Sequence, residues 1–179
     1  MIHNDHVNLL RKGILDEGGV WADLGAGAGA FTLALAELIG PTGIIYAVDK
    51  DSSLLRQLAR AMGLQFPAVT LHCVAGDFTL PLALPALDGI VMANSLHFVQ
   101  RKEPVLRQVC SYLRPDGRLL LIEYNTDTGN VWVPHPLSLP TWAKLAVRCG
   151  FTDTELLAKQ PSRFLGEFYS AVSRRGEFG

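Results

Sequence analysis

The sequence predicts an α/β protein in which helices cover a mostly parallel β-sheet. Short apolar segments alternate with helical patterns along most of the chain, which is typical of parallel sheets with right-handed crossovers. The segment Ile44-Ile45-Tyr46-Ala47-Val48 is apolar throughout, as expected of a strand buried on both faces. Near the end of the chain, only residues 158–163 separate two apolar segments, which predicts an antiparallel pair.

Composition narrows the class of protein. The chain has 179 residues, of which 49% are hydrophobic and 18% charged, so disorder is excluded and one domain is expected over residues 1–179. The formal net charge of −1 lacks the basic excess of nucleic-acid-binding proteins. The apolar runs are too short to span a membrane, and the N-terminal residues do not resemble a signal peptide. Three widely spaced cysteines, expected to be packed thiols, suit a reducing compartment, and we expect a soluble cytoplasmic protein.

Local signals define the elements of the first half. An apolar stripe at helical spacing predicts a helix over residues 5–16, which either packs on the sheet or serves as a lid (residues 1–18) over a site. After the first strand come three glycines and a helix that begins at Phe31 and is stopped by residues 40–43. Asp51 or one of the two serines after it caps the third helix.

Prolines and glycines divide the second half. Residues 80–85 are rich in proline and are expected to form a loop, and Pro104 suits the first turn of the fourth helix. Residues 114–117 read as a turn, and residues 125–140 as a long loop on the substrate side. The expected strands are residues 19–24, 44–48, 69–74, 87–93, 118–123, 151–157 and 164–172. The expected helices are residues 5–16, 31–39, 52–62, 103–113 and 141–149.

Polar or glycine residues follow four consecutive strands. They are Asp23-Leu24-Gly25, Asp49, Gly76-Asp77 and Asn94-Ser95. Ligands of open parallel sheets bind beyond the carboxyl ends of the strands, so these residues should line one crevice. Each end alone is a weak signal, but four in succession predict a nucleotide-like site.

Each strand end suits a different part of a nucleoside. The glycines of the segment 25–29 allow positive φ and close approach of a ligand to the main chain. Asp49 lies about 20 residues after the first glycine, where a carboxylate can accept both hydroxyls of a ribose. Asp77 can accept a hydrogen bond from the exocyclic amine of adenine, with Phe78 beside the ring, and Asp23 would face a cationic group.

The charge of Asp23 helps to choose among nucleotides. Gly25, Gly27 and Ala30 also fit the dinucleotide fingerprint Gly-x-Gly-x-x-Ala, which leaves an NAD(P)-dependent oxidoreductase as an alternative. A carboxylate at the strand end would repel a pyrophosphate and would attract an ammonium or sulfonium centre. S-adenosylmethionine carries both cationic centres and has no phosphate.

Over nearly its whole length, the chain resembles the class I S-adenosylmethionine-dependent methyltransferases. Its segments resemble the family's motifs in order: an acid with Gly-x-Gly-x-Gly, the ribose-binding acid, the adenine-binding acid, the fourth-strand motif and the turn into the fifth strand. These segments are residues 23–29, 47–51, 75–78, 87–97 and 113–119. The resemblance implies a Rossmann-like three-layer α/β/α sandwich, with a mostly parallel seven-stranded sheet whose last strand is antiparallel. It also implies S-adenosylmethionine as cofactor and S-adenosylhomocysteine as product. The implied cofactor-binding residues are Asp23, Gly25, Ala26, Gly27, Gly29, Asp49, Lys50, Gly76, Asp77, Phe78, Asn94 and Ser95.

Departures from the family's patterns bear on the acceptor. No Asn-Pro-Pro-Tyr or Asp-Pro-Pro-Tyr sequence follows the fourth strand, and no Pro-Cys pair marks a cytosine-C5 enzyme. The Asp-Asp-Asn metal set of catechol-type enzymes is not evident, so we predict no metal. The chain lacks a large insertion, so residues 1–18 and 125–140 are expected to form the acceptor side, alone or with a partner subunit. We expect a small-molecule acceptor; an RNA or protein acceptor, and a non-catalytic cofactor-binding module, stay open as alternatives.

Methyl transfer by in-line displacement depends mainly on alignment, so no catalytic residue is required. His97 is a candidate general base, or else a strand-end histidine bonded to the backbone. The family resemblance implies that Glu123 and Tyr124, at the end of the fifth strand, face the site, where Tyr124 either orients a nucleophile or closes the core.

Overall fold

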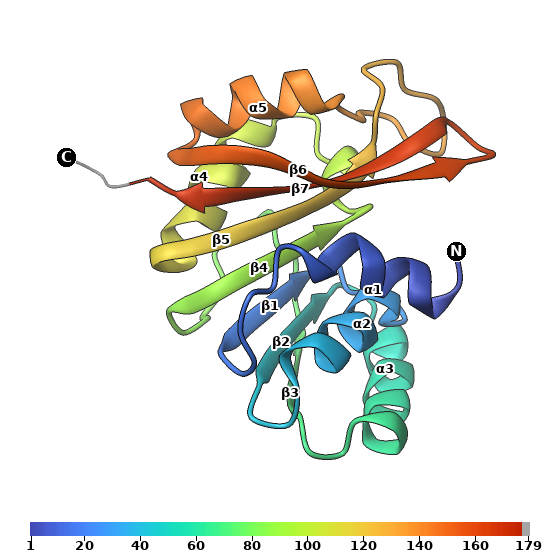
Figure 1. The fold of residues 1–179 in the computed structure, drawn as a ribbon, viewed down its shortest axis with the longest axis vertical. Coiled ribbons are helices and arrows are strands. Elements are labelled where there is room, and N and C mark those ends of the chain that lie inside the picture. The colour runs from blue at the N-terminus through green and yellow to red at the C-terminus, as the bar shows by residue number, and fades with distance from the viewer. Residues whose placement is uncertain (177–179) are drawn as a thin grey trace.

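A seven-stranded sheet with the order β3-β2-β1-β4-β5-β7-β6 runs through the protein (Figure 1). The structure is a computed structural model that describes residues 1–176. The strands are β1 Val20–Leu24, β2 Ile44–Asp49, β3 Thr70–Ala75, β4 Leu87–Ala93, β5 Leu113–Tyr124, β6 Phe151–Ser162 and β7 Gly166–Arg175. Only β7 is reversed: it pairs antiparallel with both β5 and β6, while the other pairs are parallel. The predicted mostly parallel sheet with an antiparallel last strand is confirmed.

Helices cover both faces of this sheet, as Figure 1 shows. They are α1 His3–Arg11, α2 Ala30–Ile39, α3 Ser52–Gln65, α4 Lys102–Tyr112 and α5 Leu139–Arg148, with a short 3-10 helix η1, Leu96–Phe98. Buried side chains of α1, α2 and α3 form one apolar layer with the sheet, and those of α4 and α5 form the other. This gives the three layers that the sequence predicted. No helix among residues 1–176 is long and apolar enough to cross a membrane.

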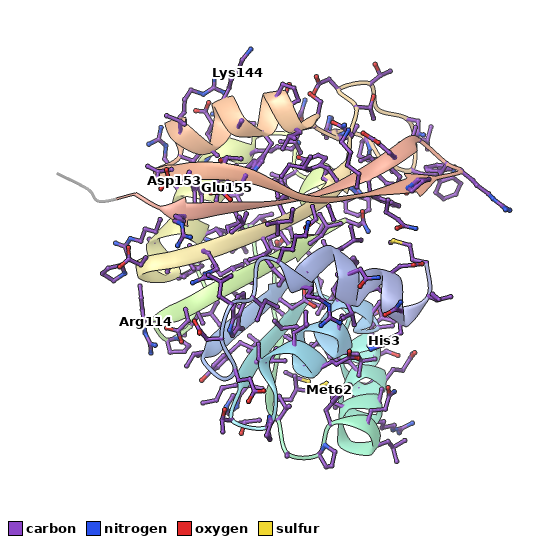
Figure 2. All side chains as sticks on the ribbon, in the orientation of Figure 1. His3, Met62, Arg114, Lys144, Asp153 and Glu155 are labelled. Carbon is purple, nitrogen blue, oxygen red and sulfur yellow. The ribbon has the colours of Figure 1, made fainter. Side chains whose placement is uncertain are left out.

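Polar and apolar side chains separate as the helical patterns require. Met62 on the inner face of α3 is buried, and Trp142 of α5 is fully enclosed. Charged side chains such as Lys144 of α5 and Arg114 of β5 point away from the sheet (Figure 2). The buried stripes of the helices therefore hold the sheet, and through it the carboxyl ends of the strands, in place.

Some boundaries differ from the predicted ones. The first helix ends at Arg11 rather than at residue 16, and β6 and β7 continue to within a few residues of each other. The expected turn at residues 114–117 belongs to β5, as an irregular stretch where Asp116 has a φ of 62° and the pairing with β4 shifts register. Turn-forming residues here make a bulge inside a strand and do not end it.

The cysteines are packed in two cases out of three. Cys110 and Cys149 are buried as expected, but Cys73 is exposed. Cys73 lies on β3, which is an edge strand that pairs only with β2. An edge strand is covered less completely than a central one, and this explains why the expectation of a packed Cys73 was wrong.

The carboxyl ends of the parallel strands share one side of the molecule. In Figure 1 the arrowheads of β1 and β4 point to the side where α1 begins. The loop between β5 and α5, residues 125–138, starts from the same side. This side holds all the strand ends that the sequence marked as polar.

Candidate functional site

Three positive φ angles shape the glycine segment between β1 and α2. They are 85° at Gly25, 54° at Gly27 and 93° at Gly29. A Cβ atom at Gly25 would lie 2.5 Å from the Cβ of Ser95, and one at Gly29 would lie 2.2 Å from the Cδ1 of Leu58. A Cβ at Gly27 would meet nothing within 4 Å. Gly25 and Gly29 are therefore required for close packing, and the structure places Gly29 against α3, whereas the face of Gly27 is open.

Asp49 holds this glycine segment from the end of β2. Its Oδ2 accepts the main-chain N–H of Gly27 at 2.8 Å, and its Oδ1 accepts that of Asp51 at 2.9 Å. The carbonyl of Val48 accepts the N–H groups of both Gly25 and Ala26. The second strand thus fixes the shape of the loop that follows the first strand.

A pocket of about 350 Å³ lies beyond the ends of β1, β2, β3 and β4. All four polar strand ends that the sequence singled out contribute to its wall. The lining residues are Gly25, Asp49, Lys50, Gly76, Phe78, Thr79, Asn94, Ser95, Phe98 and Val99. Seven of these ten residues were predicted from the sequence as cofactor-binding residues, and the structure adds Thr79, Phe98 and Val99 to the wall.

A second hollow of about 230 Å³ lies on the other side of the glycine segment. It shares Gly25 and Asn94 with the first pocket, so the two adjoin. The rest of its wall comes from the start of the chain, the end of β1, the glycine segment, the start of α2 and the end of β4. These residues are Met1, His6, Asp23, Ala26, Ala28, Ala30, Phe31 and Ala93.

Asp23 is almost fully buried, with 1% of its surface exposed. Its Oδ2 accepts a hydrogen bond of 2.6 Å from the hydroxyl of Thr32, whereas its Oδ1 is buried and has no hydrogen-bond partner within the described residues. Burial raises the pKa of Asp23 from 3.8 to about 6; the nearby charge of Asp49 adds to the rise and the Thr32 hydroxyl opposes it. The Oδ1 of an ionised carboxylate in this position lacks a donor from the described residues.

Asn94 is the second residue with an unsatisfied buried oxygen. It follows β4 with a φ of 52°, a left-handed conformation that asparagine tolerates better than most residues. Its side-chain Oδ1 is buried and makes no hydrogen bond to any residue from 1 to 176. Because Asn94 lines both hollows, its amide group lies where they adjoin.

The carboxylate of Asp77 is already engaged. Lys50 Nζ lies 2.8 Å from its Oδ2, and both the N–H and the hydroxyl of Thr79 donate to its Oδ1. Burial alone would raise the pKa of Asp77, but the hydrogen bonds from Lys50 and Thr79 outweigh it and lower that pKa. The pocket wall at this point consists of Gly76, Phe78 and Thr79. Because Oδ2 of Asp77 has Lys50 as its one partner among the described residues, it can accept a further hydrogen bond, and the predicted contact of Asp77 with adenine stays a prediction.

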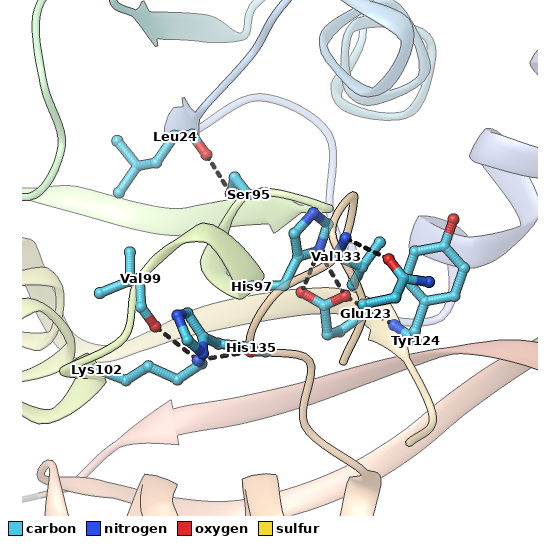
Figure 3. A network of polar contacts seen from close by, with 10 residues as sticks. Leu24, Ser95, His97, Val99, Lys102, Glu123, Tyr124, Val133 and His135 are labelled. Carbon is cyan, nitrogen blue, oxygen red and sulfur yellow. Dashed lines mark hydrogen bonds and ion pairs between the residues drawn. The ribbon is translucent and has the colours of Figure 1, made fainter. Parts of the chain in front are cut away.

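His97 and Glu123 form a buried pair at the ends of β4 and β5 (Figure 3). The Nδ1 of His97 lies 2.8 and 3.0 Å from the two carboxylate oxygens of Glu123. Its ring is thus bonded to a side chain, so the alternative of a backbone-bonded histidine is wrong. Tyr124 packs against Phe168, with ring centroids 4.2 Å apart, and burial followed by the charge of Glu123 raises its pKa.

Sequence reasoning missed several partners within the site. Thr32, Thr79 and Phe98 carry no motif signal, since their positions depend on how helices and turns return to the strand ends. Glu123 itself was expected to face the site from the end of the fifth strand, and as a buried carboxylate it needs a partner. Its pairing with His97, 26 residues away in sequence, required the sheet order.

Comparisons with known proteins agree with this geometry. A family model described as a methyltransferase domain matches residues 22–119. The ubiquinone/menaquinone biosynthesis C-methyltransferases UbiE of Burkholderia mallei and Burkholderia thailandensis are 30% identical over 117 residues, which are 65% of this chain and 46% of each relative. The chain thus spans less than half the length of these curated relatives.

Solved structures share the fold at low sequence identity. The YcgJ protein of Bacillus subtilis superimposes with a TM-score of 0.78 at 14% identity, covering 98% of this chain and all of the other. The 1,6-didemethyltoxoflavin-N1-methyltransferase of Burkholderia thailandensis, solved with 1,6-didemethyltoxoflavin and S-adenosylhomocysteine, gives 0.75 at 20% identity, covering 98% and 78%. The family model matches more than half of the chain, and the chain shares the fold of these solved structures. The chain therefore belongs to the methyltransferase-domain family, the class I S-adenosylmethionine-dependent methyltransferases that its motifs resemble.

Proposed function

We propose that this chain binds S-adenosylmethionine along the carboxyl ends of β1 to β4 and transfers its methyl group to a small molecule. The observation that carries the proposal is the pair of buried, unpartnered oxygens of Asp23 and Asn94 beside the glycine segment. Buried polar atoms are nearly always hydrogen-bonded, so a donor from a ligand is expected here. S-adenosylmethionine, when bound, supplies a methyl group on a positively charged sulfur, and it also carries an ammonium group that fits these oxygens.

The larger pocket suits the nucleoside part. Each oxygen of Asp49 accepts one main-chain N–H, and a carboxylate oxygen can accept a further hydrogen bond, so ribose hydroxyls can be added without breaking the loop. Phe78 offers an aromatic face for adenine, beside the backbone of Gly76. Gly25 lines both this pocket and the smaller hollow, and next to it the open face of Gly27 leaves the main chain accessible.

The charge of Asp23 disfavours a dinucleotide. Asp23 places a carboxyl group beside the glycine segment, and in its ionised form it would repel a pyrophosphate bound there. Asp49 does not separate the two readings, because NAD enzymes also use an acid at this position. An NAD(P)-dependent oxidoreductase is therefore the weaker alternative. A non-catalytic module that only binds the cofactor is the other alternative, because the pocket holds the donor and does not by itself require an acceptor.

The chain's part in the reaction is to bind and align. Methyl transfer proceeds in line, so fixing donor and acceptor at contact distance supplies much of the rate. We propose that α1 and residues 125–140 flank the acceptor side, with His6 in the wall of the smaller hollow. The printed names of the UbiE relatives and of the toxoflavin enzyme concern small ring compounds, which supports a small-molecule acceptor. A cytoplasmic location stays part of the proposal, supported by three free cysteines.

Transfer of a radiolabelled methyl group tests the proposal. The wild-type protein is incubated with methyl-labelled S-adenosylmethionine and a panel of phenols, naphthols and hydroxyquinones, and label in the extracted acceptor is counted. Labelling of at least one acceptor, abolished by excess S-adenosylhomocysteine, is the expected result. Binding of S-adenosylhomocysteine without labelling of any acceptor would favour the non-catalytic module, and no binding would overturn the proposal.

A further inference from the structure

We propose that His97 is the catalytic base that removes a proton from the acceptor, and that Glu123 is the positioning residue that holds its ring. This inference rests on the proposed methyl transfer and adds to it the class of acceptor: a flat ring that bears an ionisable hydroxyl group. The structure supports it through the buried histidine–carboxylate pair, its place beside the pocket and the aromatic side chains around it.

The pair fixes which nitrogen of His97 is available. Glu123 is completely buried and His97 is 3% exposed, and both carboxylate oxygens lie within hydrogen-bond distance of Nδ1. A carboxylate only accepts, so Nδ1 carries the donated proton, and the neutral ring then keeps its lone pair on Nε2. That Nε2 makes no hydrogen bond to any described residue. In Figure 3 the ring turns its other edge away from Glu123.

The ring lies beside the pocket because of its place in the chain. His97 belongs to η1, the turn that directly follows Asn94 and Ser95 at the end of β4. The same turn places Phe98 and Val99 in the pocket wall. Glu123 stands at the end of the neighbouring strand, β5. His97 thus lies in sequence between the wall residues Asn94 and Ser95 and the wall residues Phe98 and Val99, and the proposal places the acceptor at this part of the wall.

Further hydrogen bonds fix the turn that carries His97. The main-chain N–H of His135 donates to the carbonyl of His97 at 3.0 Å. Lys102 Nζ donates to the carbonyls of Val99 and His135, each at 2.7 Å. These bonds tie η1 and α4 to the loop of residues 125–138, as Figure 3 shows. A base held in one orientation by such contacts is prepared for proton transfer.

The charged and titratable groups around the pair come from four elements. Glu123 and Tyr124 belong to β5, and Lys102 belongs to α4. His135 belongs to the loop between β5 and α5, and Tyr169 belongs to β7, where it pairs with Glu123 across the sheet. Burial lowers the pKa of Lys102, and the charge of Glu123 opposes this effect. Burial, followed by the charge of Glu123, raises the pKa of Tyr169 well above its usual value. Glu123 is the acid in direct contact with His97.

Aromatic side chains lie close to the imidazole. The ring centroid of Phe98 lies 4.3 Å from that of His97, and that of Tyr124 lies 6.1 Å from it. The ring centroid of Phe164 lies 6.1 Å from that of Tyr124. Phe98 is 64% exposed and Phe164 51%, so both present large apolar rings to the surface. A flat aromatic acceptor can stack on such faces.

In the proposed step the acceptor gives a proton to His97 and receives the methyl group. The acceptor's O–H bond breaks, its proton goes to Nε2 of His97, and the electron pair stays on the acceptor. That pair, at the oxygen or at a ring carbon conjugated with it, forms the new bond to the transferred methyl carbon. The carbon–sulfur bond breaks with its electrons left on sulfur, so a neutral thioether is released. When a ring carbon accepts the methyl group, its own C–H bond then breaks, the proton goes to solvent water, and the electron pair restores the ring.

Nitrogen NMR of the protein tests the orientation of the base without an acceptor. In a long-range proton–nitrogen spectrum, with His97 assigned by comparison with His97→Gln, we expect the ring proton on Nδ1 and none on Nε2, with and without S-adenosylhomocysteine. A proton on Nε2 would overturn the proposal.

Kinetics with two probes test the chemical role. At pH 7.5, 2-naphthol keeps its hydroxyl proton, whereas 2-hydroxy-1,4-naphthoquinone is already ionised and needs no base. His97→Gln should lower kcat/KM for 2-naphthol by about 100- to 1,000-fold but for the ionised probe by less than about fivefold. Glu123→Gln should lower kcat/KM for 2-naphthol by at least about tenfold. His72→Gln, at an exposed site on β3, is the matched control and should change neither.

The outcomes separate this proposal from the proposed function. Equal losses with both probes would mean that the pair is only structural and would overturn the inference. So would a wild-type protein that binds S-adenosylhomocysteine but methylates neither probe, because the proposed acceptor class would then be wrong. A wild-type protein that does not bind S-adenosylhomocysteine would overturn the proposed function itself.

Discussion

Replacing Asp23 by asparagine should stabilise the ligand-free protein and at the same time weaken its binding of S-adenosylhomocysteine. Burial raises the pKa of Asp23 from 3.8 to about 6, a difference of about two pH units. Each unit corresponds to about 1.4 kcal/mol, so at pH 7.5 the ionised carboxylate destabilises the fold by up to about 3 kcal/mol. Asparagine has a similar shape, can still accept from Thr32 and carries no charge, so we expect a gain of about 1–3 kcal/mol.

The sign of the pH dependence follows from the same shift. Because the folded protein binds this proton more tightly than the unfolded chain, the contribution of Asp23 to stability is greatest below pH 4 and is lost as the pH rises through about 6. Binding of a cationic ligand has the opposite trend, because it needs the ionised carboxylate. Affinity should therefore fall as the pH drops below about 6, by up to about tenfold per pH unit.

Thermal unfolding and calorimetry measure both effects. At pH 7.5, Asp23→Asn should bind S-adenosylhomocysteine about 1.5–3 kcal/mol less tightly, because a charge-assisted hydrogen bond is lost. Its affinity should be nearly independent of pH between 5 and 7.5. Asp16→Asn, at an exposed carboxylate, is the matched control and should leave both quantities unchanged. A variant that binds as tightly as the wild type, or is less stable without ligand, would refute this account of Asp23.

Three further variants test other parts of the site. Gly25→Ala should abolish binding and lower the melting temperature, because Gly25 has a positive φ and a methyl group there would collide with the side chain of Ser95. Gly63→Ala in α3 is the control: a Cβ there meets nothing within 4 Å, so stability should rise by about 0.5–1 kcal/mol. Asp49→Ala should weaken binding of S-adenosylhomocysteine by about 1–3 kcal/mol. Its control, Asp51→Ala, should cost about 1 kcal/mol of stability because it removes the N-cap of α3, and should leave the affinity unchanged. Asn94→Gly keeps the positive φ but removes the amide, so affinity should fall by about 1 kcal/mol or more while the fold persists.

Three outcomes of calorimetry and thermal unfolding would contradict these expectations. Unchanged affinity in Asp49→Ala would mean that this residue only supports the loop. Unchanged affinity in Asn94→Gly would remove one of the two oxygens on which the proposed ammonium site depends. Binding by Gly25→Ala at wild-type strength would show that the loop tolerates a side chain, against the contact of 2.5 Å.

The sheet and the strand ends could be predicted because they depend on local patterns. Buried parallel strands are apolar throughout, and the residues that end them are polar or glycine whichever strand lies beside them. Because helices alternate with these strands, the carboxyl ends of the parallel strands lie on one side of the sheet. The positions of the predicted site residues between Asp23 and Ser95 follow from this arrangement. The reversal of β7 was predictable from the short link after β6.

Other features depend on distant neighbours and could not be predicted. Cys73 is exposed because β3 lies at the edge of the sheet, and its own apolar strand pattern does not contain that information. Asp77 turns to Lys50 and Thr79 because both happen to lie within reach of its oxygens. The partner of His97 lies on the next strand, so motif spacing offered only two general roles for that histidine.

The binding of S-adenosylhomocysteine compared with NADH tests the central claim most directly. Thermal unfolding of the wild-type protein is measured alone, with S-adenosylhomocysteine and with NADH. At a ligand concentration about 100 times its Kd, binding adds about 2.7 kcal/mol of stability, which corresponds to roughly 5–10 °C for a chain of this size. We predict this rise with S-adenosylhomocysteine and none with NADH. A rise with NADH and none with S-adenosylhomocysteine would contradict the account.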